Sequence, residues 1–504
     1  MDAVSAVIFT VLVLITLGIT YMAARRSKSA ADHFVAGGQL SGRQNGLAIA
    51  GDYISAASFL GVTGAIALGG FNGFYLAVFV PVAYLLTLLL VAEPLRNLGR
   101  FTLADVLASR FRGQTVRSAM AITTVVVSTV YLIAQFVGAA LLVTALFDID
   151  YTVAVLVIGG LTTVYTLLGG MLATSWIQIV KTGLMLACTV TLFVLILNKY
   201  DFNPLGAFND ALHTVGQQAV APSRTTALAG FDQLSMVVGL VLGVLGLPHV
   251  MIRFLTVPDA RAARSSAVTA IWVFAAFYLM IPVIGYGAGQ LVGRDGIAAK
   301  HPAGNLAVVQ LAESLGGNLL LAVVAAVAFV TILAVLSGLV MAVSGAVAHD
   351  VYGQVLKRGA ATARGELTAA RFATLATCAV GVVIALAAER QNIAFLASLA
   401  FAVAASANLP ALLLTIYWRR MTARAVISGM AVGLVTSLTI ILLGPAVNGP
   451  DAVLGFSNPA LVSLPLSLLV SVLVALVLPD RGEAADTGQS TFRSLRLKAL
   501  TGVS

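Results

Sequence analysis

GLAIAGDYISAASFLGVTGAIALGG, residues 46 to 70, is almost entirely apolar, yet it carries one acidic side chain, Asp52. A membrane-spanning helix needs about 20 predominantly apolar residues, and this stretch supplies them. A charged side chain at the bilayer centre costs about 2.5 to 3.5 kcal/mol on insertion scales, so such residues usually face a cavity, a partner or a solute. The stretch therefore predicts a membrane helix that handles a solute.

The composition of the whole chain excludes a soluble protein. Hydrophobic residues make up 60% of it, charged residues only 10%, and the mean hydropathy is +1.00. Soluble domains average about 25% charged residues, so we predict an all-α, polytopic membrane protein. Apolar runs of spanning length predict thirteen transmembrane helices, at residues 3–23, 45–69, 73–93, 118–147, 151–168, 172–198, 234–256, 266–292, 318–349, 367–389, 393–418, 422–444 and 459–478.

The distribution of basic residues supports this count, because cytoplasmic connections of membrane proteins collect Lys and Arg. With the N-terminus outside, alternate connections hold 23 of the 29 basic residues. We therefore expect a multi-pass protein of the plasma (inner) membrane with a cytoplasmic C-terminus. The net charge of +9 is spread over these short connections, so it indicates topology and not nucleic-acid binding.

The chain leaves no room for a separate soluble domain. Residues 1–480 are expected to form a single transmembrane domain in the lipid bilayer, and residues 481–504 a short basic cytoplasmic tail. The tail segment TFRSLRLKAL alternates basic and apolar residues, which suits either a helix on anionic lipid or a loosely ordered, solvated tail. The two cysteines, Cys188 and Cys378, lie in different spans, so we expect no disulfide, no resident metal and no cofactor.

A second span also contains helix-breaking residues. GLVLGVLGLPHVMIRFLTV, residues 239 to 257, places Gly243, Gly246 and Pro248 inside an apolar run. Proline lacks an amide hydrogen and clashes with the preceding turn, so this helix should break near Gly246 to Pro248. Spans 2–6 and 7–11 then form an inverted repeat in which each half begins with an interrupted helix, and such repeats bind solutes near the bilayer centre.

Each polar residue in these spans also has a structural interpretation. Asp52 can be a hydrogen-bonded structural carboxyl. His249 and Arg253 share one helix face near the cytoplasmic end, where packing and charge placement explain them about as well as ligand contact does. Gln178 and Lys181 lie about two and three turns into span 6, where the lysine can snorkel to the interface.

Taken together, these features resemble the sodium:solute symporters, and within them the cation/acetate branch. The resemblance covers nearly the whole chain and rests on DHFVAGGQLSGRQNGLAIAGDYISAASFLG (32–61), LLGGMLATSWIQIVKT (167–182), LGLPHVMIRFLTVPDARAAR (245–264) and TILAVLSGLVMAVSGAVAHDVYG (331–353). It implies a thirteen-helix bundle of the leucine-transporter type. Such a bundle imports a small solute by alternating access with a co-moving cation.

The resemblance also marks positions for the cation. In sugar and proline members, backbone carbonyls at the first break and a pair of hydroxyl side chains in span 9 hold sodium, but the pair is Ala334 and Val335 here. A hard cation needs several oxygens in place of its hydration shell, and Thr331 and Ser337 can supply some of them. The coupling ion is therefore sodium or a proton. The candidate cation-binding or coupling residues are Gly51, Asp52, Ile54, Gln178, Thr331, Ala334, Val335 and Ser337.

Substrate contacts are expected at the two breaks. The N-terminal ends of half-helices present free amide groups and the positive end of a helix dipole, which suit a carboxylate. Either a cation separates an anionic solute from Asp52, or Asp52 is protonated and donates to the solute. The candidate substrate-binding residues are Asp52, Tyr53, Ser55, Ser58, Gly246, Pro248 and His249.

Three classes of function fit these observations. We expect a symporter, working as a monomer, that imports a short-chain monocarboxylate: acetate first, with propionate, pyruvate and lactate as further substrates. A sodium-coupled carrier of a neutral solute such as proline is the alternative within transport, and a membrane sensor or channel-like protein with a transporter fold is the alternative from another class. An enzyme is not expected, because no span offers paired carboxylates, a His and Cys cluster or a nucleophile with its base.

Overall fold

The computed structural model describes residues 38–111, 114–168, 171–222, 226–479 and 483–502, together with short pieces before residue 19. Within this part of the chain every regular element is a helix, as the hydropathy of the sequence predicts. In a bilayer the backbone groups of a spanning segment must find partners within the protein, and a helix pairs them within its own segment.

Helices occupy each predicted span from the second onwards. Within the described ranges ten helices are long and apolar enough to cross a membrane, and one bent helix pair makes up to eleven. The first predicted span, residues 3–23, lies largely outside the described residues, so the count of thirteen stays a prediction. The other spans are α5 (Phe71–Leu90), α8 (Gln114–Phe147), α9 (Tyr151–Leu168), α10 (Met171–Lys199), α14 (Ala260–Ala288), α16 (Ala307–Gly345), α17 (Ala363–Ala387), α18 (Ile393–Ala407) with α19 (Leu409–Tyr417), α20 (Ala423–Leu443) and α22 (Ala460–Val477). α16 is kinked at Gly316 and Gly317, whose backbone is not helical.

The first predicted interruption is present in the second span. α3 (Gly42–Tyr53) ends where Ile54 adopts an extended backbone, and a short π-helix, η2 (Ala57–Gly61), then leads into α4 (Val62–Gly69). The two halves of the span are bent by 59° relative to each other. The chain therefore changes direction at Ile54, two residues after Asp52.

The second predicted interruption is present as well. α12 (Ala227–Gly243) continues into a turn of 3-10 helix, η4 (Val244–Gly246), after which Leu247 is extended. The chain resumes as α13 (Pro248–Met251) and ends in η5 (Ile252–Leu255). A proline at the first position of a helix loses no hydrogen bond, because that amide has no partner within the helix. The residue that breaks α12 thus begins α13.

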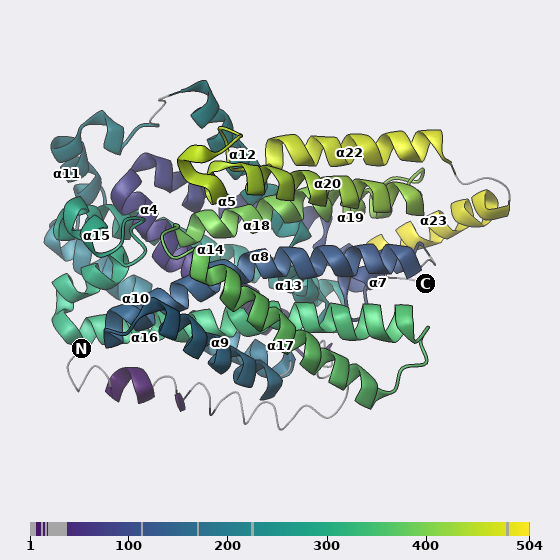
Figure 1. Cartoon of the computed structure of the whole chain (residues 1–504), viewed down its shortest axis with the longest axis horizontal. Helices are drawn as coiled ribbons and strands as arrows, with labels where there is room; N and C mark the ends of the chain where they lie inside the picture. Colours follow the sequence, from purple (N-terminus) through teal and green to yellow (C-terminus); the bar gives the residue numbers. More distant parts are fainter. Residues whose placement is uncertain are drawn as a thin grey trace.

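The spanning helices run along the long axis of the molecule (Figure 1). α11 (Gly206–Val215) and α15 (Arg294–Lys300) lie at one end, whereas α7 (Leu103–Ala108) and α23 (Glu483–Thr501) lie at the other. The most apolar windows of the spans containing α16 and α18 are 78% and 89% buried, against 33% for α22. α18 and the part of α16 from Ala322 onwards therefore form the centre of the bundle, where polar side chains such as Thr331 are buried.

Connections that are predicted to be cytoplasmic meet on one face. Arg96, which follows α5, donates through Nε to the carbonyl of Val257 at 2.5 Å. Arg110, before α8, donates through Nη2 to the carbonyl of Arg419 at 2.6 Å. The connections after spans 3, 7 and 11 are thus in contact, as the alternation of basic residues requires. Which side of the membrane this face meets stays a prediction.

The C-terminal tail is a helix that packs against the protein. Asn97, in α6 (Ala92–Leu98), donates through Nδ2 to the carbonyl of Ala499 in α23 at 2.9 Å. Phe492 and Ala499 are buried, whereas Leu497 is 55% exposed. The helix is therefore docked through one face, which differs from a loosely ordered tail because its apolar residues find partners on α6.

Candidate functional site

A buried ion pair between Asp52 and Arg253 joins the two interrupted helices. Asp52 lies in the last turn of α3 and Arg253 in η5, and each side chain is 1% exposed. Arg253 donates through Nε to Oδ2 and through Nη2 to Oδ1 of Asp52, the second bond measuring 3.2 Å. Its Nη1 donates to Ser175 Oγ of α10 at 2.6 Å. Bidentate pairs of this kind are geometrically specific, so Asp52 fastens the end of α3 to η5.

Helices α10 and α16 complete the surroundings of Asp52. Gln178 Nε2 donates both to Asp52 Oδ1 and to the carbonyl of Ala334, the latter at 3.1 Å. Lys181 Nζ donates to the carbonyl of Thr331, also at 3.1 Å. In the described part of the chain, Gln178 Oε1 and Thr331 Oγ1 are buried without a hydrogen-bond partner. The two helices therefore present several oxygen atoms beside the end of α3.

The other candidate cation residues lie around the same layer. Gly51 packs directly on α10, where a Cβ atom would come within 2.6 Å of the carbonyl oxygen of Gln178. Ile54 stands at the break, and its amide donates to the last turn of α3. Val335 and Ser337 are buried in α16 without a hydrogen bond to the polar side chains of α10. The geometry of these four residues does not by itself define a cation site.

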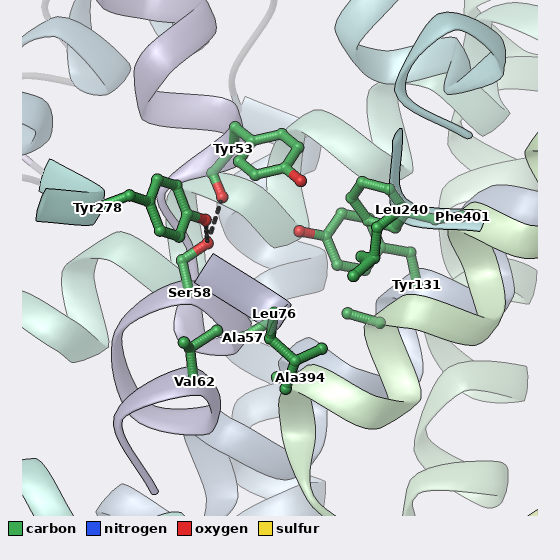
Figure 2. Close-up of a pocket in the computed structure, with 11 residues that line it drawn as sticks. Tyr53, Ala57, Ser58, Val62, Leu76, Tyr131, Leu240, Tyr278, Ala394 and Phe401 are labelled. Atoms are coloured by element: carbon green, nitrogen blue, oxygen red, sulfur yellow. Dashed lines mark hydrogen bonds between the residues drawn. The ribbon is translucent and has the colours of Figure 1, made fainter. Parts of the chain in front are cut away.

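A small cavity lies on the other side of the first break. Its volume is about 20 Å³, while about 10 to 15 Å³ suffices for one water molecule. Among the described residues no charged side chain lines it, and aromatic rings, small apolar groups and hydroxyls form its wall (Figure 2). The lining residues are Tyr53, Ala57, Ser58, Val62, Leu76, Tyr131, Leu240, Tyr278, Ala394, Ala397 and Phe401.

Hydroxyl groups provide the polar part of this wall. The hydroxyl of Tyr278 donates to Ser58 Oγ at 2.8 Å, and Ser58 in turn donates to the carbonyl of Tyr53 at 2.9 Å. The hydroxyls of Tyr53 and Tyr131 point towards each other across the cavity (Figure 2). The Tyr131 hydroxyl lies 3.1 Å from Ser55 Oγ, and either group can donate. The cavity thus presents hydroxyl donors to a small solute.

The second break lies behind Tyr131. His249, in α13, is 3% exposed, and its ring centre is 5.3 Å from that of Tyr131. Neither ring nitrogen of His249 has a hydrogen-bond partner within the described residues. Gly246, just before the break that precedes Pro248, accepts a hydrogen bond from Asn408 Nδ2 at 2.8 Å. Buried polar groups normally have partners, but within the described residues the imidazole and Asn408 Oδ1 lack them at this break.

The cavity brings together some of the predicted substrate residues. Tyr53 and Ser58 line it. Ser55 and His249 do not line the cavity themselves, but each contacts Tyr131, which does. The remaining three predicted substrate residues do not line this cavity: Asp52, Gly246 and Pro248.

Sequence reasoning missed two tyrosines of the cavity and the partner of Asp52. Tyr131 and Tyr278 stand in the long apolar spans α8 and α14. A buried tyrosine usually places its hydroxyl near a partner, so an isolated tyrosine in an apolar span is a signal for a polar site. The chain has 12 tyrosines, however, and residue type alone does not select these two.

A second polar cluster lies at the face where the predicted cytoplasmic connections meet. Asp105, His349 and Asp350 are close enough together to share a metal ion. Arg117 Nη1 already lies 2.8 Å from Asp105 and 3.1 Å from Asp350. Burial raises the pKa of Asp105, but hydrogen bonds from His349 and the Phe101 amide, with the charge of Arg117, hold that pKa below its usual value. The guanidinium supplies the positive charge here, so the cluster is an ion-pair network.

The architecture and the cavity define a class of protein. A helical bundle with two interrupted helices, and a small cavity beside their breaks, is typical of secondary transporters built from inverted repeats. The model of the sodium:solute symporter family matches residues 33–433, and the chain belongs to this family.

Relatives and solved structures agree with this membership. The chain is 43% identical to the uncharacterized symporter YwcA of Bacillus subtilis, over 100% of this chain and 99% of the relative. It is 40% identical to the monocarboxylic acid transporter of Corynebacterium glutamicum, over 98% and 94%. A Na⁺-coupled sialic acid symporter shares the fold with a TM-score of 0.77 at 15% identity, covering 95% of this chain and 100% of that one. The nucleobase-cation-symport-1 transporter MHP1 shares the fold with a TM-score of 0.56 at 13% identity, covering 92% of this chain and 99% of that one.

Proposed function

We propose that this protein is a secondary active symporter that imports a short-chain monocarboxylate with a cation by alternating access. Acetate is the first candidate, before propionate, pyruvate and lactate. The observation that carries the proposal is the cavity at the first break, in which hydroxyl groups face a small space with an otherwise apolar wall. The family, and the 40% identity to a protein named a monocarboxylic acid transporter, support it.

The cavity matches both ends of such a solute. The hydroxyls of Tyr53 and Tyr131 point towards each other and can donate to the two oxygens of one carboxylate (Figure 2). Hydrogen bonds to a charged acceptor contribute about 1.5 to 3 kcal/mol each. Ala57, Ala394 and Ala397 leave room for a chain of a few carbons, because each ends at a methyl group. The cavity is small, so a solute of this size enters after a modest opening of the site.

A zwitterionic solute such as proline fits this wall less well. A buried ammonium group needs an acidic or carbonyl partner, since an unpaired charge in an apolar site is costly. Among the described residues no carboxylate lines the cavity. Asp52 directly precedes the cavity residue Tyr53 in the sequence, but its carboxylate is paired with Arg253. This arrangement favours a solute whose only charge is negative.

Cation coupling follows from the charge of the solute. An interior-negative membrane potential opposes the entry of an anion by about 2.3 kcal/mol per charge for each 100 mV. One accompanying monovalent cation makes the step electroneutral, and a second makes the potential favourable. We propose the plasma membrane as its location, with the N-terminus outside and the C-terminus cytoplasmic, a monomer as the functional unit, and sodium or a proton as the coupling ion.

Uptake of labelled acetate into proteoliposomes tests this function, with sodium and proton gradients imposed separately. We expect accumulation above the external concentration with at least one gradient. Unlabelled propionate and pyruvate should compete with acetate, whereas proline should not. Equilibration without accumulation would indicate a channel-like protein. Labelled proline uptake that acetate does not block would replace the proposed substrate class.

A further inference from the structure

Lys181 is buried in the middle part of α10, in the same layer as Asp52. The helix runs from Met171 to Lys199, and the Lys181 side chain is 1% exposed. Its Nζ donates to the carbonyl of Thr331 in α16 at 3.1 Å. The side chain therefore does not snorkel to the membrane interface, because its amine is directed into the bundle.

Two buried oxygen atoms of α10 and α16, the helices of Lys181 and its acceptor, lack hydrogen-bond donors. Thr331 Oγ1 and Gln178 Oε1 are buried, and neither has a hydrogen-bond partner in the residues that the structure describes. Gln178 Oε1 lies against α3, where a Cβ atom on Gly51 would come within 2.8 Å of it. Backbone and side-chain oxygens from α10 and α16 thus meet beside α3. Several oxygens from different segments are the surroundings that a hard cation requires.

The charges at this junction leave Lys181 without a carboxylate of its own. Asp52 is the acid of the cluster, and Arg253 binds both of its oxygens. A guanidinium and a carboxylate paired in this way carry no net charge together. With Lys181 in its ammonium form the cluster carries one positive charge in excess. A sodium ion at the same oxygens would be a further cation within a few ångströms, and repulsion between like charges is strong where little water screens it.

We propose that the amine of Lys181 is a built-in replacement for a transported sodium ion at the junction of α3, α10 and α16, so that this junction takes no sodium. Tethering supplies the cation without the need to strip water from an ion in each cycle. The inference rests on the proposed symport function and narrows its coupling step, because the backbone carbonyl of Thr331 then accepts from a fixed lysine and not from a transported ion.

The response to sodium tests the proposal in the purified, full-length protein. We expect the wild-type melting temperature, and acetate uptake into proteoliposomes, to be equal in sodium chloride and in choline chloride. Lys181→Met removes the amine and keeps an unbranched side chain. In choline its uptake should fall by about tenfold, as expected for a lost hydrogen bond to a charged group. Its ratio of uptake in sodium to uptake in choline should rise above that of the wild type.

Lys199→Met, at the exposed end of the same helix, is the matched control and should behave as the wild type. The proposal is overturned if sodium raises the wild-type melting temperature, or if wild-type uptake requires sodium. It is also overturned if Lys181→Met takes up acetate in choline at the wild-type rate. Should that variant fail to fold, the two wild-type measurements decide alone. Should the wild type carry no monocarboxylate, the proposed function fails, and the sodium effect on melting still tests the lysine.

Discussion

Arg253 pairs with Asp52 on the side of the two breaks that lies away from the cavity. Asp52 precedes the first break and Arg253 follows the second, whereas the cavity residue Ser58 follows the first break and Leu240 precedes the second. Alternating access requires the two sides of a solute site to open in turn. The ion pair holds the two interrupted helices together on one side, which is the cytoplasmic side in the predicted orientation.

Loss of either partner of this ion pair should destabilise the protein. Asp52→Asn leaves the Arg253 guanidinium buried without its carboxylate, and Arg253→Met leaves the carboxylate without its guanidinium. Removing one partner of a buried pair costs about 3 to 5 kcal/mol. We expect a lower melting temperature and little acetate accumulation for each single variant. The double variant Asp52→Leu/Arg253→Met should lose less stability than the sum of the two single losses.

A different outcome would assign another role to Asp52. If Asp52→Asn retains full stability and still takes up acetate, but no longer responds to a pH gradient, the carboxyl carries a proton. Full accumulation of acetate that still responds to the pH gradient would exclude Asp52 both as an essential ion-pair partner and as the proton carrier. Thermal denaturation and uptake of the same preparations distinguish these cases.

Loss of the cavity hydroxyls should weaken substrate binding. Tyr53→Phe and Tyr131→Phe each remove one of the two hydroxyls that point towards each other across the cavity (Figure 2). Each lost bond to a charged or buried acceptor costs about 1 to 3 kcal/mol, so we expect kcat/KM for acetate to fall about 5- to 150-fold. Tyr75→Phe, in α5 outside the cavity wall, is the control and should leave the kinetics unchanged. Unaltered kinetics in both cavity variants would place the carboxylate elsewhere.

Narrowing the cavity should change the choice among acids. Ala397 contributes one methyl group to the wall, and Ala397→Val adds two more carbon atoms there. Propionate and lactate are longer than acetate, so we expect their uptake to fall further than that of acetate. One methylene group in an apolar pocket changes specificity by about 10- to 200-fold. Competition assays measure the change, and Ala360→Val in an exposed connection is the control. An equal loss for all three acids would contradict a size filter at this position.

The interrupted helices could be predicted because their signals are local. Gly246 and Pro248 stand within three positions of each other in an apolar run, and the structure breaks the helix there. Basic residues in alternate connections likewise predicted which loops share a face. Arg96 and Val257 then meet there, although 161 positions separate them. Short-range chemistry and membrane topology therefore account for most of the fold.

The contents of the site could not be predicted in the same way. Asp52 and Arg253 are 201 positions apart, and nothing local in either stretch indicates the partner. Arg253 is equally explained by the excess of basic residues near cytoplasmic helix ends. The sequence position of Lys181 allows its side chain to snorkel to the interface, whereas tertiary packing directs its amine to Thr331. The residue types indicate which side chains are candidates for the site, but the packing of distant helices determines which of them contact each other.

The ion-pair network around Arg117 should stabilise the face at which the predicted cytoplasmic connections meet, and the effect should depend on pH. Arg117→Met leaves Asp105 and Asp350 close together without the guanidinium between them.

The pKa of Asp105 is lowered in the folded protein, because the hydrogen bonds from His349 and Phe101 and the charge of Arg117 outweigh its burial. A lowered pKa means that the stabilisation is present above the ordinary value of 3.8 and is lost as the pH falls through the folded value. We therefore expect Arg117→Met to reduce the melting temperature most at neutral pH and progressively less in acid. Arg364→Met, an exposed arginine at the start of α17, should change neither value. A loss of stability that is as large in acid as at neutral pH would show that Arg117 acts through packing and not through its charge.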